Sequence, residues 1–578
     1  MRSLSYCYHQ FSLVNFLSLG LTLFFLIGCA STGGEYRHNI QLESVYIDGC
    51  FGEWDGLDAF SYKVNQRQEG YDLLSHREIA WLEAKTSSAF QHLMNHLEQE
   101  SPLSEMRRDA ILSELNRWPD LYRQVPNDWI SRLSEWEDFS LLRFPRALLL
   151  RDREIDAAWL ESFFDAPSAV ELFRHLTVFE IGQRMLDEDG ALVLASMHEQ
   201  WSPSLREFSL FGNQVGGAAI IALLESGAFD HLRYLNLGYS AIEPANLKQV
   251  LLSPRLEGLQ GLGLRLTSLM ALEKQFADIL ETGLLFRSLR SLDISDTLMP
   301  DSIIQVITES GKLSGLESLN LSRNYVTDQG IGFLVETENL GSLQRLELFE
   351  NHITEDGLAR LIMAPLASQL QYLGLGRSRW IAASLSKQSI ETMISPENSL
   401  TSLKCLSLRN LAIGAEGIER LTSSDRMRDL VYLNLTNTEI SEVNLTVVPG
   451  SSLLDSLPNL RYLRLDENCI GDDIGSFLAI DGTHTLRELS IRSNHITEDG
   501  LRDLLATFRQ QNLLRLDLTG NPINEEILQR LRDDDEYLVD MEIIWERGPN
   551  SWELCPRSAY RRVPLLKKYP EPAMDEVE

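Results

Sequence analysis

Leucines recur along the chain in a fixed frame. The octapeptide NHITEDGL occurs at 351–358 and again, unchanged, at 494–501. Apolar residues around both copies follow the pattern L-x-x-L-x-L-x-x-N-x-I. The frame starts at Leu205, Leu232, Leu259, Leu289, Leu316, Leu343, Leu370, Leu403, Leu430, Leu460, Leu486 and Leu513, with looser copies from Pro145 and Leu176. Most starts lie 27 residues apart, so the sequence predicts 14 stacked units of one repeated shape.

Each unit is expected to hold one short strand and one helix. The second and third apolar positions of the frame alternate along a strand, so both side chains point inward. The Asn position begins a turn, and its amide can pair with backbone groups that the turn leaves unpaired. Asn324 and Asn351 are examples of this structural role. In the repeat from Leu343, Thr354 is expected to cap a helix. Helices are wider than strands, so the stack must curve.

The frame resembles that of leucine-rich-repeat proteins, and its period resembles the ribonuclease-inhibitor-like subclass. The resemblance covers about two thirds of the chain. It implies an α/β fold, a curved leucine-rich-repeat solenoid (horseshoe). Parallel strands would lie on the concave face and helices on the convex face. We assign this solenoid to residues 141–530.

The regions on either side of the repeats differ in character. Residues 73–140 carry helical apolar stripes and predict an N-terminal helical cap. Residues 29–72 form an irregular linker with a short β region. Its I-D-G…E-W string resembles the opening strand of some secreted carbohydrate-binding modules. Residues 531–578 are expected to be a C-terminal cap and tail.

The first residues indicate export. An apolar run from Phe16 ends in Leu26-Ile27-Gly28-Cys29, which resembles the lipobox of bacterial lipoproteins. The resemblance predicts a signal peptide over residues 1–28 and lipidation of Cys29. The chain would then be extracytoplasmic and lipid-anchored, and Ala30-Ser31 resembles an outer-membrane sorting context. The alternative is an uncleaved membrane anchor.

Charge and cysteine content narrow the function further. The formal net charge of −32 argues against non-specific nucleic-acid binding, which needs clustered cations. Four cysteines (Cys50, Cys405, Cys469 and Cys555) remain besides Cys7 and Cys29, too few in a chain of this size to predict a disulfide framework. Cys405 and Cys469 lie two repeats apart, which is too far for a bond between them.

The third position of the frame faces the concave side and supplies the main candidate site. Consecutive frames place Arg345, Tyr372, Cys405, Tyr432 and Tyr462 in one row, with Phe349 one strand away from Tyr372. Gly374 and Gly376 are expected to leave bare backbone beside that row. Tyrosine and arginine are common among the residues that dominate protein interfaces. A smaller cluster consists of Phe211, Tyr234 and Tyr239. The alternative is that these are scattered surface aromatics without a function.

These features predict a non-enzymatic module that binds a protein or peptide on its concave face, without a cofactor and as a monomer. The sequence has no Gly-rich phosphate loop or nucleophile elbow, and His92 and His96 read as a solvated or core pair rather than metal ligands. Two alternatives stay open. One is binding of carbohydrate or an envelope polymer by the concave aromatics. The other is GTPase activation through an exposed arginine, Arg377 or Arg379.

Overall fold

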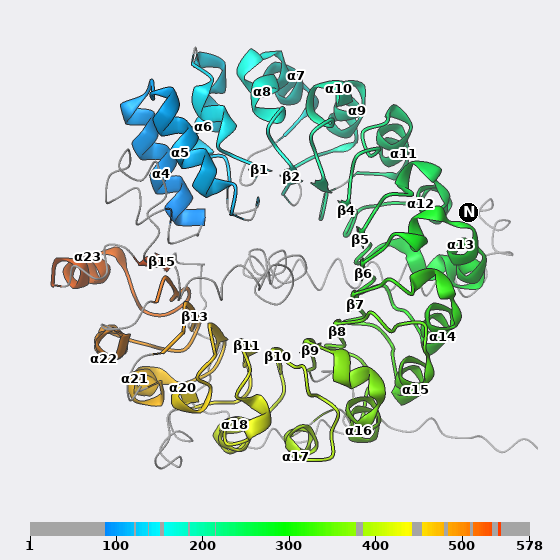
Figure 1. The fold of residues 1–578 in the computed structure, drawn as a ribbon, viewed down its shortest axis with the longest axis vertical. Helices are drawn as coiled ribbons and strands as arrows, with labels where there is room; N and C mark the ends of the chain where they lie inside the picture. The colour runs from blue at the N-terminus through cyan, green and yellow to red at the C-terminus, as the bar shows by residue number, and fades with distance from the viewer. Residues whose placement is uncertain are drawn as a thin grey trace, which may run out of the picture.

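The repeats form one continuous curved sheet in the computed structural model. The structure describes residue 82 and residues 87–544, apart from 119, 121–122, 137, 151–154, 183–184, 214, 377–384, 386, 442–452, 479–483, 509–512 and 535–540. Fifteen strands, β1 to β15, pair in parallel and in chain order. The two end strands are not paired with each other, so the sheet is open. Figure 1 shows the strands around the inside of the arc and the helices around its outside.

Each predicted frame supplies one strand, which begins at the third frame position. The strands are β1 (Ala147–Leu150), β2 (Val178–Ile181), β3 (Glu207–Ser209), β4 (Tyr234–Asn236), β5 (Gly261–Gly263), β6 (Ser291–Asp293), β7 (Ser318–Asn320), β8 (Arg345–Glu347), β9 (Tyr372–Gly374), β10 (Cys405–Ser407), β11 (Tyr432–Asn434), β12 (Tyr462–Arg464), β13 (Glu488–Ser490) and β14 (Arg515–Asp517). Third positions pair with third positions across the sheet, as Arg345 does with Tyr372.

A fifteenth strand, β15 (Glu542–Ile544), extends the sheet beyond the 14 predicted units. It pairs with β14 in the same register, with Arg515 opposite Glu542. The sequence has Asp540 at the first frame position, where the other late repeats have leucine, so the frame is broken there. The expected C-terminal cap therefore contributes a strand to the sheet.

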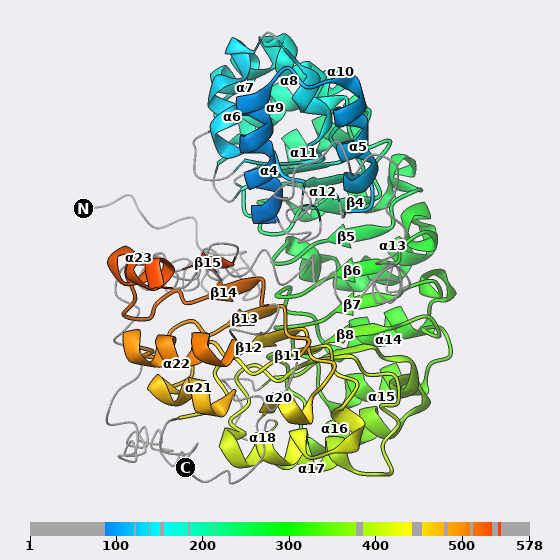
Figure 2. The ribbon, with the colours of Figure 1, turned by 60° about the vertical axis from the view of Figure 1, so that its left-hand side comes forward.

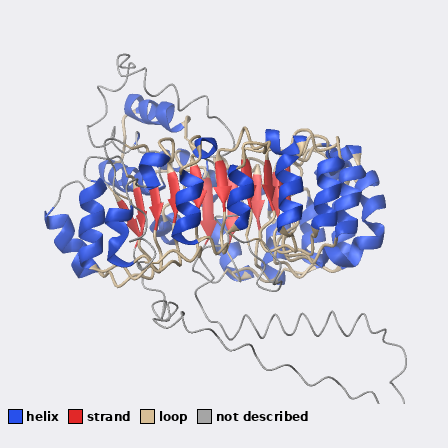
Figure 3. Ribbon diagram, turned by 90° about the horizontal axis from the view of Figure 1, so that it is seen from below, coloured by secondary structure: helices blue, strands red, loops and turns tan. Residues whose placement is uncertain are grey.

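Helices connect the strands on the convex side. In the first half these are α7 (Ala157–Asp165), α8 (Pro167–Phe173), α9 (Glu188–Ser196), α10 (His198–Trp201), α11 (Gly217–Ser226), α12 (Pro244–Leu252), η7 (Pro254–Leu256), η8 (Ser268–Gln275), α13 (Phe276–Thr282) and η9 (Leu284–Arg287). In the second half they are α14 (Asp301–Glu309), η10 (Gly311–Leu313), α15 (Asp328–Glu336), α16 (Glu355–Met363), η11 (Pro365–Gln369), α17 (Gln388–Ile394), α18 (Gly414–Thr422), η12 (Asp425–Met427), α20 (Leu453–Ser456), η13 (Gly471–Asp473), α21 (Ile474–Phe477), α22 (Glu498–Phe508) and α23 (Glu525–Asp534). Figure 3 shows the loops gathered at the two rims of the sheet.

One hydrophobic core runs through the whole stack between strands and helices. In the repeat from Leu343, Leu346 and Leu348 are buried on the strand, and Leu358 is buried on helix α16. The Thr354 hydroxyl accepts a hydrogen bond from the Asp356 N–H and caps that helix, as predicted. Because a single repeat cannot bury these side chains, each depends on its neighbours.

Helices close the N-terminal end of the sheet. They are α4 (Ser87–Glu100), α5 (Glu105–Leu115), α6 (Asn127–Arg132), η5 (Leu133–Glu135) and η6 (Ser140–Arg143). The Val125 N–H donates to the Ala147 carbonyl at 2.9 Å, so this region pairs with the open edge of β1. Buried Trp129 donates through Nε1 to Glu98 at 2.8 Å and packs against Trp136. Figure 2 shows the blue helices beside the first repeats.

Several predicted features lie outside the described residues. They are the signal peptide (1–28), Cys29, the linker (29–72), the last residues of the tail (545–578), Arg377 and Arg379. None of the described helices is long and apolar enough to cross a membrane.

Candidate partner-binding surface

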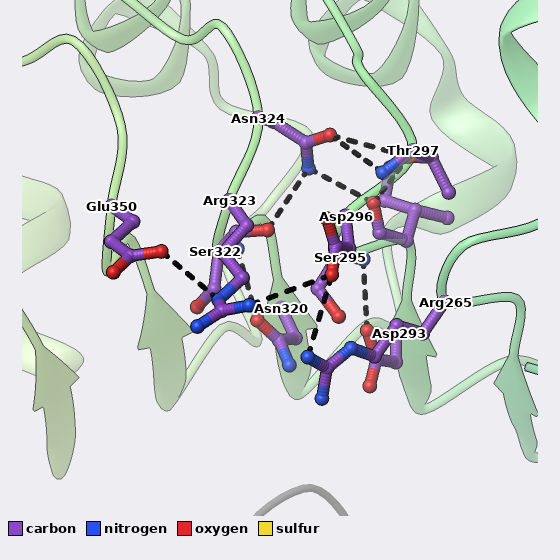
Figure 4. Close-up of polar contacts among 11 residues, drawn as sticks. Arg265, Asp293, Ser295, Asp296, Thr297, Asn320, Ser322, Arg323, Asn324 and Glu350 are labelled. Carbon is purple, nitrogen blue, oxygen red and sulfur yellow. Dashed lines mark hydrogen bonds and ion pairs between the residues drawn. The ribbon is translucent and has the colours of Figure 1, made fainter. Parts of the chain in front are cut away.

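The asparagines of the frame are structural, as expected. Asn324 donates from Nδ2 to the carbonyls of Ile294 and Leu321 at 2.9 and 3.0 Å. Its Oδ1 accepts from the N–H groups of Thr297 and Met299 at 3.1 and 2.9 Å. Figure 4 shows this amide between two successive turns. All its hydrogen-bonding capacity goes to the backbone and to Thr297, so it has none to offer a partner.

The structure brings the predicted concave row together. Arg345, Tyr372, Cys405, Tyr432 and Tyr462 occupy paired positions on β8 to β12. The Arg345 guanidinium lies 3.6 Å from the centre of the Tyr372 ring, a close cation–π contact. The rings of Tyr372 and Tyr432 are stacked with centroids 6.3 Å apart.

The row is not the open surface that was expected. Tyr372 is 2% exposed and Tyr432 is 4% exposed, and Cys405 between them is fully buried. Burial raises the pKa of the Tyr372 hydroxyl well above its ordinary value, and the nearby Glu347 carboxylate adds to the effect. The two rings are therefore not available to a partner at the surface.

The backbone beside the row is also covered. A Cβ at Gly374 would overlap the Glu347 carboxylate, and one at Gly376 would overlap the Phe349 ring. These glycines make room for side chains of the preceding strand, so the predicted bare backbone is absent there. Glu347 also forms an ion pair with Arg345 at 2.9 Å.

The second predicted cluster is partly accessible. Phe211 is buried, and its ring centre lies 5.2 Å from that of Tyr239. Tyr234 and Tyr239 are 39% and 38% exposed. The Tyr234 ring packs over Gly261 on the next strand, where a Cβ would overlap it.

Exposed apolar side chains continue from Tyr239 over the next three repeats, at the turns that follow β5, β6 and β7. Leu266 and Leu298 are each 39% exposed and Tyr325 is 46% exposed. We call Tyr239, Leu266, Leu298 and Tyr325 the rim ridge. Of these four residues only Tyr239 is among the sequence-predicted candidates, because side chains at the eighth and tenth frame positions lie outside the core pattern. The other repeats carry polar residues or glycine at the eighth position, and that contrast was the available signal for Tyr239 and Leu266.

Three of the four rim-ridge residues lie in left-handed backbone, a conformation that the turns of most other repeats share. Tyr239, Leu266 and Leu298 have φ values of 59°, 49° and 61°, in the left-handed region. Bulky side chains rarely adopt this conformation, which costs on the order of 1–2 kcal/mol per residue. Glycine or asparagine would fit these turns better. At these positions the residue type does not suit the backbone conformation. Such mismatches are tolerated mainly at functional surfaces.

A chain of ion pairs accompanies the rim ridge. Arg265 pairs with Asp296 at 3.4 Å, Arg323 pairs with the same carboxylate at 3.8 Å, and Arg323 pairs with Glu350 at 3.1 Å. Figure 4 shows this alternating ladder across consecutive turns. Arg265, Asp296 and Arg323 precede Leu266, Leu298 and Tyr325 by one or two residues, so charged and apolar groups lie side by side.

The ladder is fixed in place and electrically balanced. Its two arginines and two carboxylates sum to zero charge, and the Arg265, Asp296 and Glu350 side chains are 10–14% exposed. Beneath it, Asp293 accepts from the Ser295 N–H at 2.9 Å, and burial raises the pKa of this carboxyl. The described residues include no group of three His, Cys, Asp or Glu side chains that could hold a metal ion. The chemistry on offer is apolar and aromatic contact beside charged hydrogen-bonding groups.

Strand order, register and core together define a curved α/β leucine-rich-repeat solenoid. A family model described as Leucine Rich repeat matches residues 456–479 and 483–505, so the chain carries leucine-rich repeats. A search among curated proteins finds no match.

Solved structures of low sequence identity resemble the chain. One is an internalin from Listeria monocytogenes, with 18% identity over 69% of this chain and 94% of that one, and a TM-score of 0.31. Another is the complex of Rad7 and Elc1 in yeast, with 18% identity, 68% and 88% coverage and a TM-score of 0.39. A third is a TLR13–ssRNA13 complex, with 18% identity, 72% and 63% coverage and a TM-score of 0.27.

Proposed function

We propose that the protein is a non-enzymatic binding module that docks a partner protein on its rim ridge. The observation that carries the proposal is the run of four exposed apolar side chains on four consecutive repeats, three of them in strained backbone. Stability alone would select against such residues, because they bury little surface and cost conformational energy. Docking to a partner would bury the apolar surface and so offset the conformational energy.

The composition of the ridge indicates the chemistry of the partner. Tyr239 and Tyr325 offer aromatic faces, and Arg265 lies 5.6 Å from the centre of the Tyr239 ring. The accompanying ladder has no net charge, so it favours neither a polyanion nor a polycation. We infer a protein segment with apolar or aromatic anchors flanked by mixed charges, which matches the anatomy of protein interfaces.

We also infer that the module works outside the cytoplasm as a monomer, anchored through lipid on Cys29. The lipobox-like segment supports the anchor. Cys405 and Cys469 are both disulfide-bonded, against the sequence expectation of no disulfide framework, and such bonds persist mainly in oxidising compartments. Membrane fractionation of a Cys29→Ser variant tests the anchor. The variant should lose its membrane association, and unchanged sedimentation with membranes would contradict it.

Crosslinking in native envelopes tests the ridge. We would place a photoreactive residue at Leu298 or Tyr325 and identify the captured proteins by mass spectrometry. A Leu298→Ser/Tyr325→Ser variant, with the photoreactive residue at Leu266, should lose the capture while keeping its unfolding midpoint. A Leu192→Ser/Met363→Ser variant is the matched control, since Leu192 and Met363 are 43% and 47% exposed on outer helices.

The outcomes separate the candidate functions. Capture that depends on the ridge and not on the outer helices supports the proposal. Capture that the ridge variant leaves unchanged contradicts it. Recovery of glycan alone would favour the carbohydrate-binding alternative.

A further inference from the structure

The rim ridge repeats at the spacing of the sheet itself. The Tyr239 N–H donates to the Arg265 carbonyl at 2.7 Å, and the Leu266 N–H donates to the Ser295 carbonyl at 3.1 Å. The next two turns are bonded in the same way. These bonds continue the parallel pairing of the strands into the turns, so successive turns stay about 4.8 Å apart. The four ridge side chains, one on each of four consecutive repeats, therefore extend over about 14 Å along the stack.

The ridge runs obliquely across the rim, with charged groups along one flank. Tyr239 and Leu266 occupy the eighth frame position, whereas Leu298 and Tyr325 occupy the tenth. In the repeats of Leu298 and Tyr325 the eighth position holds a charged residue of the ion-pair ladder. An apolar stripe bordered by charges is complementary to the apolar face and polar border of an amphipathic segment.

The period of the ridge matches an α-helix better than an extended segment. A helix places apolar side chains on one face about every 5.4 Å, once per turn. An extended segment places them about every 6.8 Å, at alternate residues. Over the three intervals between the ridge side chains, a helix departs from the ridge by about 2 Å and an extended segment by about 6 Å. The second departure exceeds a whole interval of the ridge, so an extended segment would not keep its anchors on all four side chains.

The charge that the ridge presents to a partner is mainly that of Arg323. Its side chain is 32% exposed, whereas those of Asp296 and Glu350 are each 14% exposed. Figure 4 shows the guanidinium between these two carboxylates. The contact with Asp296 is long, at 3.8 Å. A segment on the ridge would therefore meet a cation at its flank, which a carboxylate of the partner would complement.

A second copy of this chain does not offer a matching helix among its described residues. The helices beside the ridge, such as α14 and α15, bury their apolar residues in the core. The described helices expose large apolar side chains only singly, as Met106 on α5, Leu192 on α9 and Met363 on α16. The described part of the chain therefore favours another protein as the source of the apolar stripe.

We propose that the rim ridge binds an amphipathic α-helix of its partner protein. The helix lies along the rim across the four repeats, with its apolar face on the ridge and a carboxylate beside Arg323. It needs about 10 residues to cover the ridge, at about 1.5 Å per residue. The inference rests on the proposed function, because it specifies which kind of segment docks at that site.

Position-resolved crosslinking in native envelopes tests the helix. A photoreactive residue is placed in turn at Leu266, Leu298 and Tyr325 of the full chain, and mass spectrometry identifies the crosslinked residues of the captured protein. One repeat corresponds to about three residues of a helix but only to about one and a half of an extended segment. The crosslinked residue should therefore shift by about three or four positions for each step along the ridge.

The outcomes separate the helix from the docking site. Capture that depends on the ridge, with shifts of three or four positions, supports both. Shifts of one or two positions overturn the helix and leave the docking site standing. Crosslinks to a second copy of this chain overturn the helix in favour of self-association. If no capture depends on the ridge, the proposed function fails and the helix fails with it.

Charge reversal tests the flank of the ridge. An Arg323→Glu variant should capture the partner several-fold more weakly, and reversing the partner carboxylate that maps beside residue 323 should restore capture. Arg323→Gln, which removes the charge without adding repulsion, should weaken capture in the same direction. Arg290→Glu is the matched control, since Arg290 is another exposed arginine paired with a glutamate, at 3.3 Å. Capture that is equally strong in the Arg323 variants and the unaltered chain overturns the carboxylate contact.

A synthetic peptide with the mapped partner sequence tests the conformation. Proline at a central position that faces away from the ridge should weaken binding to the full chain by about tenfold or more, because proline interrupts a helix. Alanine at the same position should leave binding unchanged. Equal binding of the proline and alanine peptides overturns the helix, whatever the crosslinks show about the site.

Discussion

The Asp328 carboxylate occupies the space that a Cβ at Gly357 of the next repeat would fill. It accepts hydrogen bonds there from the Thr354 N–H at 2.9 Å and from the Thr354 hydroxyl at 2.6 Å. The second copy of the octapeptide repeats the arrangement, with Asp472 bonded to Thr497 and a Cβ at Gly500 overlapping that carboxylate. Both octapeptides thus require glycine at this position, because an aspartate of the preceding repeat occupies the space of its Cβ.

Replacing Gly357 with alanine should therefore destabilise the fold, although alanine is the better helix former. The methyl group would push the Asp328 carboxylate off Thr354, and we expect a loss of about 1–3 kcal/mol in the free energy of unfolding. Urea denaturation measures it. In an Asp328→Ala background the same change should cost less or even stabilise. Equal costs in both backgrounds would contradict the interpretation.

Replacing Asn324 with alanine should cost about 2–4 kcal/mol. The Thr297 and Met299 N–H groups would lose their acceptor, and the Ile294 and Leu321 carbonyls would each lose one of two donors. Thermal or urea unfolding checks this. Asn459→Ala is a suitable control, since that amide is exposed and donates to the Arg428 carbonyl. Similar losses for the two variants would speak against a special role of the frame asparagine.

Replacing Leu298 with glycine should raise the free energy of unfolding by up to about 1 kcal/mol, because glycine adopts its positive φ without strain. The same variant should bind the partner more weakly. Calorimetry and a binding assay on one preparation would reveal the trade-off. Met363→Gly, on helix α16, should instead lower stability by about 1 kcal/mol. A destabilised Leu298→Gly variant would argue against strain in the ridge.

Stability should fall with rising pH through the titration of Glu207. Burial raises the pKa of this half-buried carboxyl from its ordinary value of 4.5 to about 7. Between these values the folded protein keeps a proton that the unfolded chain has released, so the stabilisation is full below about 4.5 and is lost as the pH rises towards 7. A Glu207→Gln variant should lack this contribution to the slope. Urea denaturation at about pH 5, 6, 7 and 8 measures how the free energy of unfolding of each protein depends on pH.

Glu488→Gln controls for the amide substitution itself, since Glu488 occupies the same frame position on β13. A wild-type slope preserved in Glu207→Gln would rule out Glu207 as its source.

The repeat frame was sufficient to predict the strands, because each leucine position is dictated by a core that every unit shares. It located the third-position row for the same reason. It could not predict that Tyr372 and Tyr432 are buried, because their cover does not follow from the repeat. It also missed the exposure of Leu266 and Leu298, since turn geometry, rather than periodic burial, determines where those side chains point.

The strictly sequential order of the sheet has a mechanical consequence. Each described strand is hydrogen-bonded to the strands that precede and follow it in the chain, and successive strands such as β7 and β8 begin 27 residues apart. Tension applied between the two ends of the arc would load the outermost units first and peel them off in turn. Each step would release about 9 nm of chain. Such a molecule would lengthen under load in steps, one unit at a time, while the units that are still stacked stay folded.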